Sequence, residues 1–322
     1  MTNFIFKPAT QDLLLQFTTK RIGETKIGEK IELSSSLKEA KYVLIGIEEN
    51  LGPQANGGFS GAENAFNAFL KRFLNMQSNR FLTGNELAFI GSIQQTTDFK
   101  NIETAKSAIT ELDLLVEAVL KPYIHQGLIP IVIGGGHNNA YPIIKTISEA
   151  ANKAIDVINL DPHADCRALE GRHSGNSFSY AKENGYINHY SVLGLHKNYN
   201  STFILDYLEY NNFYYTFFDD YILNPSQFDM DLTKTFLSIS KERKFGIELD
   251  LDAIAFTPSS AFTPSGFNSL EARKYIKTLS KHSNCCYLHL PEAAPTNETE
   301  EKITGKLIAY LVADFIQENL TS

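Results

Sequence analysis

Residues 154–165 decide the fold and read Ala-Ile-Asp-Val-Ile-Asn-Leu-Asp-Pro-His-Ala-Asp. The first half is an apolar, β-branched run typical of a buried strand, and the second half carries Asp161, His163 and Asp165 at a spacing of two. Side chains two residues apart on an extended chain point to the same side, so these three are expected to converge as the strand ends. The stretch therefore predicts a buried strand with a polar site at its carboxyl end.

Seven further apolar runs resemble this one. They lie at residues 42–48, 87–91, 129–133, 190–195, 213–218, 245–251 and 285–290. Stretches with helical spacing separate most of them, at residues 61–76, 101–124, 138–150, 225–240, 268–281 and 299–318. Buried strands joined by helices predict an α/β fold with a parallel sheet between helical layers, in which ligands bind beyond the carboxyl ends of the strands. No Pro/Gly/Ser-rich linker divides the 322 residues, so a single domain spanning 1–322 is expected.

Two further blocks carry metal-ligating residue types. Gly-Gly-Gly-His-Asn-Asn at 134–139 contains His137, and Glu-Leu-Asp-Leu-Asp at 248–252 contains Asp250 and Asp252. Four carboxylates gathered in one pocket would repel one another unless cations neutralised them. Carboxylate oxygens and imidazole nitrogens suit manganese, and also iron, cobalt, nickel or zinc. The three blocks together predict a two-metal site that activates a water molecule.

Bulk composition narrows the partners and the compartment. The formal charge of -8 argues against nucleic acid or an anionic membrane as the main partner. The chain has three cysteines, an odd number, and Cys285 and Cys286 are adjacent, which argues against a disulfide framework. The first residues lack the profile of a secretory signal, and no apolar run approaches the roughly 18 residues of a membrane span. A cytoplasmic protein is expected.

The three blocks, in their order and spacing, resemble the ureohydrolase family of arginases, agmatinases, guanidino-acid hydrolases and formimidoylglutamases. The resemblance runs from about residue 42 to the final predicted helix. It implies a three-layer α/β/α sandwich around an eight-stranded parallel sheet, with two Mn²⁺ ions at the strand ends. Position by position, it implies that one metal is held by His137 and Asp165, the other by His163 and Asp252, and that Asp161 and Asp250 bridge them.

Within this family, Arg167 and the segment 257–266 favour formimidoylglutamase. The segment resembles the loop in which these enzymes place substrate-facing backbone. Arg167 matches the Asp-x-Arg pattern of formimidoylglutamases, and a guanidinium can clamp one of the two carboxylates of formimidoylglutamate. An ion pair between Arg167 and a nearby acid is the alternative. Phe178 stands near the position where arginases resemble one another in having a histidine for proton transfer, which counts against arginase.

Three residues are candidates for catalysis and substrate binding, Glu292 and Asn176 by resemblance and Asp165 as the metal ligand nearest the nucleophile. Glu292, in Leu-His-Leu-Pro-Glu-Ala-Ala-Pro at 288–295, would accept hydrogen bonds from a cationic amidine. Asp165 would take a proton from the nucleophile and pass it to the departing amine. Asn176 is a candidate substrate ligand because it lies in the segment 172–179, which resembles the family's substrate loop.

Other loop residues have simpler explanations. His173, in the same segment as Asn176, is expected to face solvent or to cap a turn. Asn56 and the glycines that follow it resemble the loop that rims the family's pocket, although a tight turn alone would explain them.

Two departures from the family pattern stand out. Glu248 replaces the usual serine, and Ala255-Phe256 replaces the usual aspartate and proline. Glu248 shares a strand face with Asp250 and Asp252, so it is expected just below the metals as a hydrogen-bond acceptor. Whether Glu248 replaces the missing acid or selects another metal stays open at this point.

The sequence thus predicts hydrolysis of N-formimidoyl-L-glutamate to L-glutamate and formamide, with a small-molecule amidine as partner and two Mn²⁺ as cofactors. One alternative is a sister activity that releases urea from arginine, agmatine or a guanidino acid. A second is a binding protein that keeps the ligands without the chemistry. A third is a nucleotide-binding fold, although no Gly-x-Gly-x-x-Gly or phosphate-loop lysine follows the early strands. The resemblance also allows a homo-oligomer.

Overall fold

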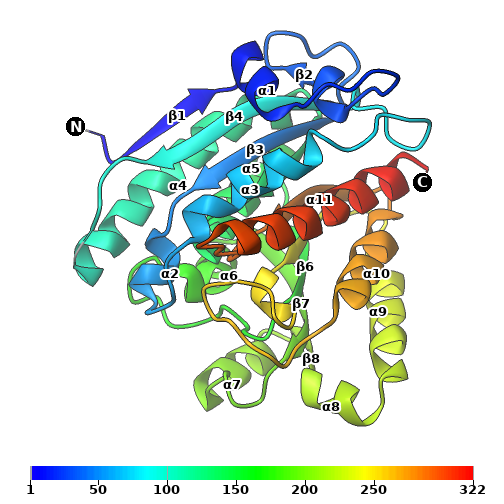
Figure 1. Cartoon of the computed structure of the whole chain (residues 1–322). Coiled ribbons are helices and arrows are strands. Elements are labelled where there is room, and N and C mark those ends of the chain that lie inside the picture. Colours follow the sequence, from blue (N-terminus) through cyan, green and yellow to red (C-terminus); the bar gives the residue numbers. More distant parts are fainter. Residues whose placement is uncertain (1, 100, 322) are drawn as a thin grey trace.

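A computed structural model describes residues 2–99 and 101–321. The strands of the described chain form one ten-stranded sheet. They are β1 (Phe4–Pro8), β2 (Glu32–Leu33), β3 (Tyr42–Glu48), β4 (Leu87–Gln95), β5 (Ile129–Ile133), β6 (Ile155–Leu160), β7 (Ile187–Leu195), β8 (Tyr214–Phe217), β9 (Phe245–Leu249) and β10 (Cys285–Leu290). The order across the sheet is β1-β4-β3-β5-β10-β9-β6-β7-β8, with β2 paired to β4 off this path. Figure 1 labels the strands toward the two edges, β1, β4 and β3 at one and β6, β7 and β8 at the other.

The eight strands from β3 to β10 correspond to the eight predicted runs, and all their pairings are parallel. The prediction of an eight-stranded parallel sheet is therefore confirmed for its core. Two additions were not predicted: β1 joins β4 in antiparallel fashion, and β2 adds two residues beside β4. In β1 only Phe4 is buried, so this edge strand lacks the apolar signal of the others.

The helices of the described chain include all six that were predicted from spacing. They are α1 (Gln11–Phe17), α2 (Leu51–Ala55), α3 (Ala65–Phe73), α4 (Ile102–His125), α5 (Ala140–Ala151), α6 (Ser177–Glu183), α7 (Thr202–Tyr210), α8 (Phe218–Leu223), α9 (Ser226–Ser238), α10 (Ser269–Ser280) and α11 (Glu298–Leu320). The unpredicted helices α1, α2, α6, α7 and α8 have nine residues or fewer, which is too short for a clear helical period. In the described part of the chain, no helix has the length and apolar character that crossing a membrane requires.

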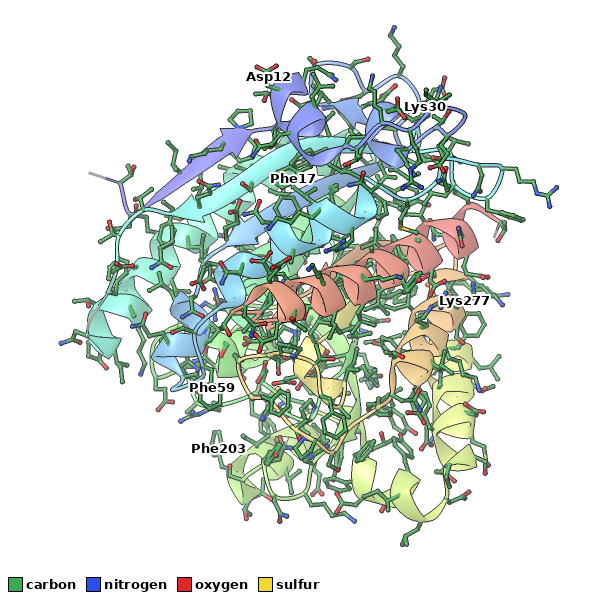
Figure 2. All side chains as sticks on the ribbon, viewed as in Figure 1. Asp12, Phe17, Lys30, Phe59, Phe203 and Lys277 are labelled. Carbon is green, nitrogen blue, oxygen red and sulfur yellow. The ribbon has the colours of Figure 1, made fainter. Side chains whose placement is uncertain are left out.

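Two hydrophobic cores lie on opposite faces of the sheet. Side chains of α3, α9, α10 and α11 fill one core, and those of α4, α5, α6 and α7 fill the other. Alternate strand residues serve the two cores: on β10, Leu288 and Leu290 face the first, whereas Tyr287 faces the second. Figure 2 shows side chains occupying the space between the sheet and its helices. The three-layer α/β/α sandwich is thus observed as predicted.

Candidate metal centre and substrate pocket

The sheet order explains how distant segments meet. Strands β5, β10, β9 and β6 are neighbours in that order, and each is followed at its carboxyl end by a polar segment. These segments are 134–139 after β5, 291–295 after β10, 250–252 after β9 and 161–165 after β6. Because the four strands are parallel, their carboxyl ends open at the same edge of the sheet.

One group of candidate ligands surrounds the ring of His137. Its Nδ1 atom lies 3.2 Å from Oδ2 of Asp161. The same nitrogen lies 3.0 Å from Oδ2 of Asp165 and 3.0 Å from Oδ2 of Asp250. All four side chains are buried, and their ligand atoms lie within 4.8 Å of one another. This group can hold one metal ion.

A second group surrounds His163, whose Nδ1 atom lies 3.3 Å from Oδ2 of Asp252 and 3.6 Å from Oδ1 of Asp161. Asp161 thus belongs to both groups, with one oxygen directed to each. This arrangement agrees with the bridging role expected of it. Asp250 falls in the first group alone, and its Oδ1 atom accepts a hydrogen bond of 2.9 Å from the Asp252 backbone N–H. Its bridging role stays a prediction.

The glycine run before His137 is required by close packing. Gly134 and Gly135 have φ values of +86° and +69°, which side chains rarely adopt. A Cβ atom on Gly135 would also lie 2.7 Å from Nδ2 of Asn139 and 2.9 Å from the carboxylate of Glu49. Only glycine therefore lets the chain turn out of β5 and direct His137 to the carboxylates.

Glu49, which sequence reasoning missed, organises this turn. Its fully buried carboxylate accepts hydrogen bonds from the Gly136 backbone N–H at 2.8 Å and from the Asn139 side-chain amide at 2.7 Å. It also accepts one from the Asn138 amide at 3.2 Å. The sequence did offer one signal for Glu49, its position directly after β3. An acid at the end of a buried parallel strand lies at the same edge of the sheet as the metal ligands.

Glu248 lies behind the ring of His137, on the side away from the carboxylates. Its Oε2 atom is 3.3 Å from Nε2 of His137 and 2.7 Å from Nδ1 of His289. Burial raises the pKa of the Glu248 carboxyl, but the two histidine rings outweigh this and lower the pKa to about 2. These contacts agree with the position expected for Glu248, below the metal ligands as an acceptor.

The electrostatics of the two groups fit divalent cations. Burial raises the pKa of Asp250 well above its usual value, and nearby Asp252 and Asp161 raise it further. Burial likewise raises the pKa of Asp252 to about 6, and its Oδ1 atom is buried without a hydrogen-bond partner among the described residues. Carboxylates that repel one another and an unpaired oxygen are what a bound cation would stabilise. The oxygen and imidazole donors suit manganese.

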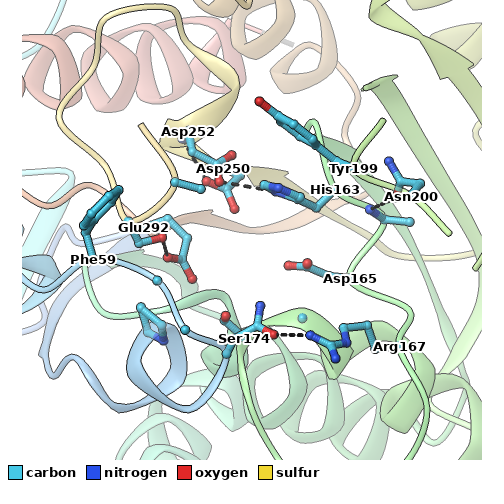
Figure 3. Close-up of a pocket in the computed structure, with 18 of the residues that line it drawn as sticks. Phe59, His163, Asp165, Arg167, Ser174, Tyr199, Asn200, Asp250, Asp252 and Glu292 are labelled. Atoms are coloured by element: carbon cyan, nitrogen blue, oxygen red, sulfur yellow. Dashed lines mark hydrogen bonds and ion pairs between the residues drawn. The ribbon is translucent and has the colours of Figure 1, made fainter. Parts of the chain in front are cut away.

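A pocket of about 370 Å³ opens onto this centre. Its walls include His163, Asp165, Arg167 and Glu292, and the exposed ring of Phe59 stands at its rim (Figure 3). Figure 3 shows Glu292 and Arg167 on opposite sides of the pocket. A small molecule placed between them would meet an acid at one end and a guanidinium at the other.

Glu292 is held rigidly at the pocket wall. The His137 backbone N–H donates to its Oε1 atom at 2.6 Å, and the Ser260 hydroxyl donates to its Oε2 atom. Its backbone has φ +67°, a strained conformation for this residue type that is typical of functional sites. Burial raises its pKa to about 8. Sequence reasoning placed Ser260 in a substrate-facing loop, 257–266, but did not predict this contact.

Arg167 combines both interpretations offered from the sequence. Its side chain is 47% exposed and lines the pocket, yet Nη2 lies 3.1 Å from Oε1 of Glu170. Its Nη1 atom donates to Oδ1 of Asn56 at 2.6 Å. The guanidinium is thus held at the mouth of the pocket with part of its surface free to contact a ligand.

Asn176, predicted to bind substrate, is fully buried and satisfied by protein groups. Its amide donates to the Gly171 carbonyl at 2.7 Å, and its Oδ1 atom accepts from the His173 backbone N–H. It does not line the pocket described above. In this structure Asn176 shapes the loop, and its position lends no support to direct substrate contact. His173 was expected to face solvent or to cap a turn, and it caps the short turn at 174–176.

Five further positions bear on specificity. Phe178 is fully buried, with its ring 5.1 Å from that of His137, so it packs under the metal centre and offers no group for proton transfer. Tyr199 and Asn200 line the pocket, and no sequence pattern predicted either of them. Ala255 and Phe256 do not line this pocket, so the missing acid leaves its walls intact.

The fold and the site define a class: an α/β/α sandwich with a candidate two-metal centre at the carboxyl ends of its parallel strands. The model of the Arginase family matches residues 40–317. This chain belongs to the arginase family.

Individual relatives agree with the family but leave the substrate open. The chain is 29% identical to a formimidoylglutamase of Staphylococcus aureus over 188 residues, which are 58% of this chain and 60% of that enzyme. A structure of Trypanosoma cruzi formiminoglutamase with Mn²⁺ matches with a TM-score of 0.73 and 20% identity, over 92% of this chain and 98% of that one. An agmatine ureohydrolase of Thermoplasma volcanium matches almost as well, with a TM-score of 0.72 and 18% identity over 92% and 94%. At these identities the structures show the fold alone.

Proposed function

We propose that this protein is a manganese-dependent hydrolase of linear amidines that converts N-formimidoyl-L-glutamate and water to L-glutamate and formamide. One observation carries the proposal: six candidate metal ligands form two adjoining groups, and four of them line a pocket together with Glu292 and the guanidinium of Arg167. The named relatives from Staphylococcus aureus and Trypanosoma cruzi support both the substrate and the metal.

The metal ions, which the two ligand groups would hold, would lower the pKa of a water molecule and so supply a nucleophile near neutral pH. The chain's own residues would place the substrate. Glu292 would accept hydrogen bonds from the amidinium and hold its carbon toward the metal centre, because the Ser260 hydroxyl and the His137 N–H fix the carboxylate. Asp165, at the pocket wall, would accept a proton from the attacking water and donate it to the departing amine.

Arg167 would select the substrate's acidic end. A guanidinium matches a carboxylate in a two-point contact, and formimidoylglutamate offers two carboxylates where arginine offers one and agmatine offers none. The substrate would have to share Arg167 with Glu170, which lies 3.1 Å from it. Asn176 would contribute by holding the loop that carries Ser174 and Gly175, both of which line the pocket.

The location and the partners belong to the same proposal. A cytoplasmic location is supported by the three cysteines, Cys166, Cys285 and Cys286, which are all buried and free. The net charge of -8 supports a small-molecule partner over nucleic acid or an anionic membrane surface. The family resemblance also implies a homo-oligomer, and analytical ultracentrifugation would measure the oligomeric state.

A product assay tests the proposal. The purified chain, loaded with Mn²⁺, is given formimidoylglutamate, arginine, agmatine and a guanidino acid in separate reactions. We expect glutamate and formamide from the first and no urea from the others. Urea release from any of the others would replace the proposed substrate, and metal binding without turnover of any compound would favour a binding protein.

A further inference from the structure

The two candidate metal-binding histidines differ in what lies behind their rings. On β9 and β10, Glu248 and His289 are register partners, which places their side chains together in the sheet interior. The fully buried Glu248 carboxylate receives a 2.7 Å hydrogen bond from the Tyr287 hydroxyl on Oε1. Its other oxygen lies 2.7 Å from Nδ1 of His289 and 3.3 Å from Nε2 of His137. Glu248 is therefore fixed from two sides and directed at the back of the His137 ring.

His163 lacks such support. Its ring stacks on that of Tyr199 with centroids 5.2 Å apart, and its side chain is 30% exposed. Among residues 2–99 and 101–321, no carboxylate other than the candidate ligands Asp161 and Asp252 lies within 4.0 Å of the ring nitrogens. One histidine is thus backed by a buried negative charge, whereas the other is backed by an aromatic face and solvent.

This difference has a direct consequence for metal binding. The Glu248 carboxylate lies 3.3 Å from Nε2 of His137 without the geometry of a hydrogen bond, so it acts on the ring through its charge. A negative charge beside Nε2 favours the tautomer with its proton on that nitrogen, which leaves the lone pair on Nδ1, and His137 directs Nδ1 at Asp161, Asp165 and Asp250. The charge also makes the imidazole a stronger donor to a cation. A serine at position 248, as the family pattern has, would carry no such charge.

We propose that Glu248 is a positioning residue that acts through His137 and makes the His137 metal position the tighter of the two. The His163 position is then the one that exchanges its ion more readily. This inference rests on the metal-binding part of the proposed function and is independent of the substrate. It also assigns a role to the unusual acid at 248 that does not involve replacing the acid missing at 255.

Manganese affinities measured on single-position backgrounds test the assignment without any activity assay. His163→Ala leaves the His137 group, and His137→Ala leaves the His163 group. Into each background we would introduce Glu248→Gln and, separately, Glu248→Ser. Free Mn²⁺ is measured at equilibrium by electron paramagnetic resonance, and thermal unfolding of each metal-free variant checks its fold. Tyr287→Phe is the matched control, because it removes a bond to Oε1 and leaves Oε2 against His137.

We expect Glu248→Gln and Glu248→Ser to weaken Mn²⁺ binding by roughly 10- to 100-fold in the His163→Ala background. The same changes should alter binding less than about threefold in the His137→Ala background, and Tyr287→Phe should do so in both. Equal weakening in both backgrounds, or no weakening in either, would overturn the proposal. The full chain given one equivalent of Mn²⁺ provides a second readout, since unequal positions give an isolated-ion spectrum and equal positions give coupled pairs.

Metal content distinguishes failure of the proposed metal centre from failure of the role proposed for Glu248. If the unaltered chain binds no Mn²⁺, both the metal centre and the role of Glu248 fall. If it binds two equivalents but the Glu248 variants match it, only the role of Glu248 falls. Three equivalents, with the third lost in His289→Ala, would mean that His137, Glu248 and His289 form a metal site themselves, and this also overturns the positioning role.

Discussion

The strand-end centre and the pocket mouth are built on opposite principles. The centre consists of four buried carboxylates, the buried His137 and the partly exposed His163, all at the carboxyl ends of parallel strands β5, β9 and β6. The mouth consists of loop residues such as Phe59 and Arg167, which are half-exposed or more. The contrast teaches that the reaction type is set by the rigid sheet, whereas the substrate is chosen by loops that can vary without disturbing it.

The largest expected effect comes from breaking the centre. Asp161→Ala removes the carboxylate that both ligand groups share, so both metals and all hydrolysis should be lost. Metal content by mass spectrometry and product release would be measured together. Asp156→Ala, on the strand β6 that precedes Asp161, is the control and should retain both. Turnover by the Asp161→Ala chain would refute the site.

Removal of metal should make stability depend on pH in a defined direction. In the metal-free chain burial raises the pKa of Asp252 from 3.8 to about 6 and that of Glu292 from 4.5 to about 8. A raised carboxyl pKa means that the folded chain binds the proton more tightly than the unfolded chain. The folded state is therefore favoured below the unfolded pKa, and that stability is lost as pH rises through the folded value.

The unfolding temperature of the chelated protein should therefore fall as pH rises from 5 to 8. Bound Mn²⁺ requires ionised carboxylates, so the metal-loaded protein should not show this fall. The gap between metal-loaded and chelated protein should widen over this interval. Thermal scans in both states measure the gap, with the Asp161→Ala chain as a control that shows none. A gap that narrows toward pH 8 would contradict the assignment.

At the mouth, the expected effect is smaller and falls on substrate capture. Arg167→Ala removes a charged contact worth about 1.5–3 kcal/mol, or roughly 10- to 100-fold in kcat/KM. Arg167→Lys should recover only part of this, because an ammonium cannot form the two-point contact. Metal content should not change in either variant. Arg80→Ala, at an arginine that stacks on Phe81, is the control. Unchanged kinetics in Arg167→Ala would mean that Arg167 does not bind the substrate and serves only as the ion-pair partner of Glu170.

The smallest effect is expected from a residue that only holds Arg167. Asn56→Ala removes the 2.6 Å hydrogen bond to Nη1, which is worth about 1 kcal/mol and predicts a rise in KM of less than about tenfold at constant kcat. Combined with Arg167→Ala it should add almost nothing, because the two changes remove the same interaction. Fully additive effects would separate Asn56 from Arg167.

What the sequence predicted follows the same division. The eight parallel strands and the convergence of the six ligands were predictable because buried strands and spacing-of-two ligands leave local signals in residues such as Asp161 and His163. The inward direction of Glu49 and the capture of Asn176 by its own loop were not predictable in this way. The place of Glu49 after β3 puts it at the correct edge of the sheet, but no local pattern gives its pairing with the Gly136 N–H, 87 residues away. Asn176 binds backbone groups of its own loop, and a residue that holds a loop cannot be told from a substrate ligand by residue type alone. Edge strand β1 was missed because it buries a single side chain.

The order of strands in the sheet also has a consequence for biosynthesis. A nascent chain that has reached residue 252 already carries all six candidate ligands, yet β10, which separates β5 from β9, has not been made. Until that late strand inserts, the backbone pairing that links β5 to β9 through β10 is missing, and with it the spacing between the His137 turn and the aspartates after β9. Ion capture should therefore be among the last events of maturation, and fragments that stop before residue 285 should fail to retain manganese.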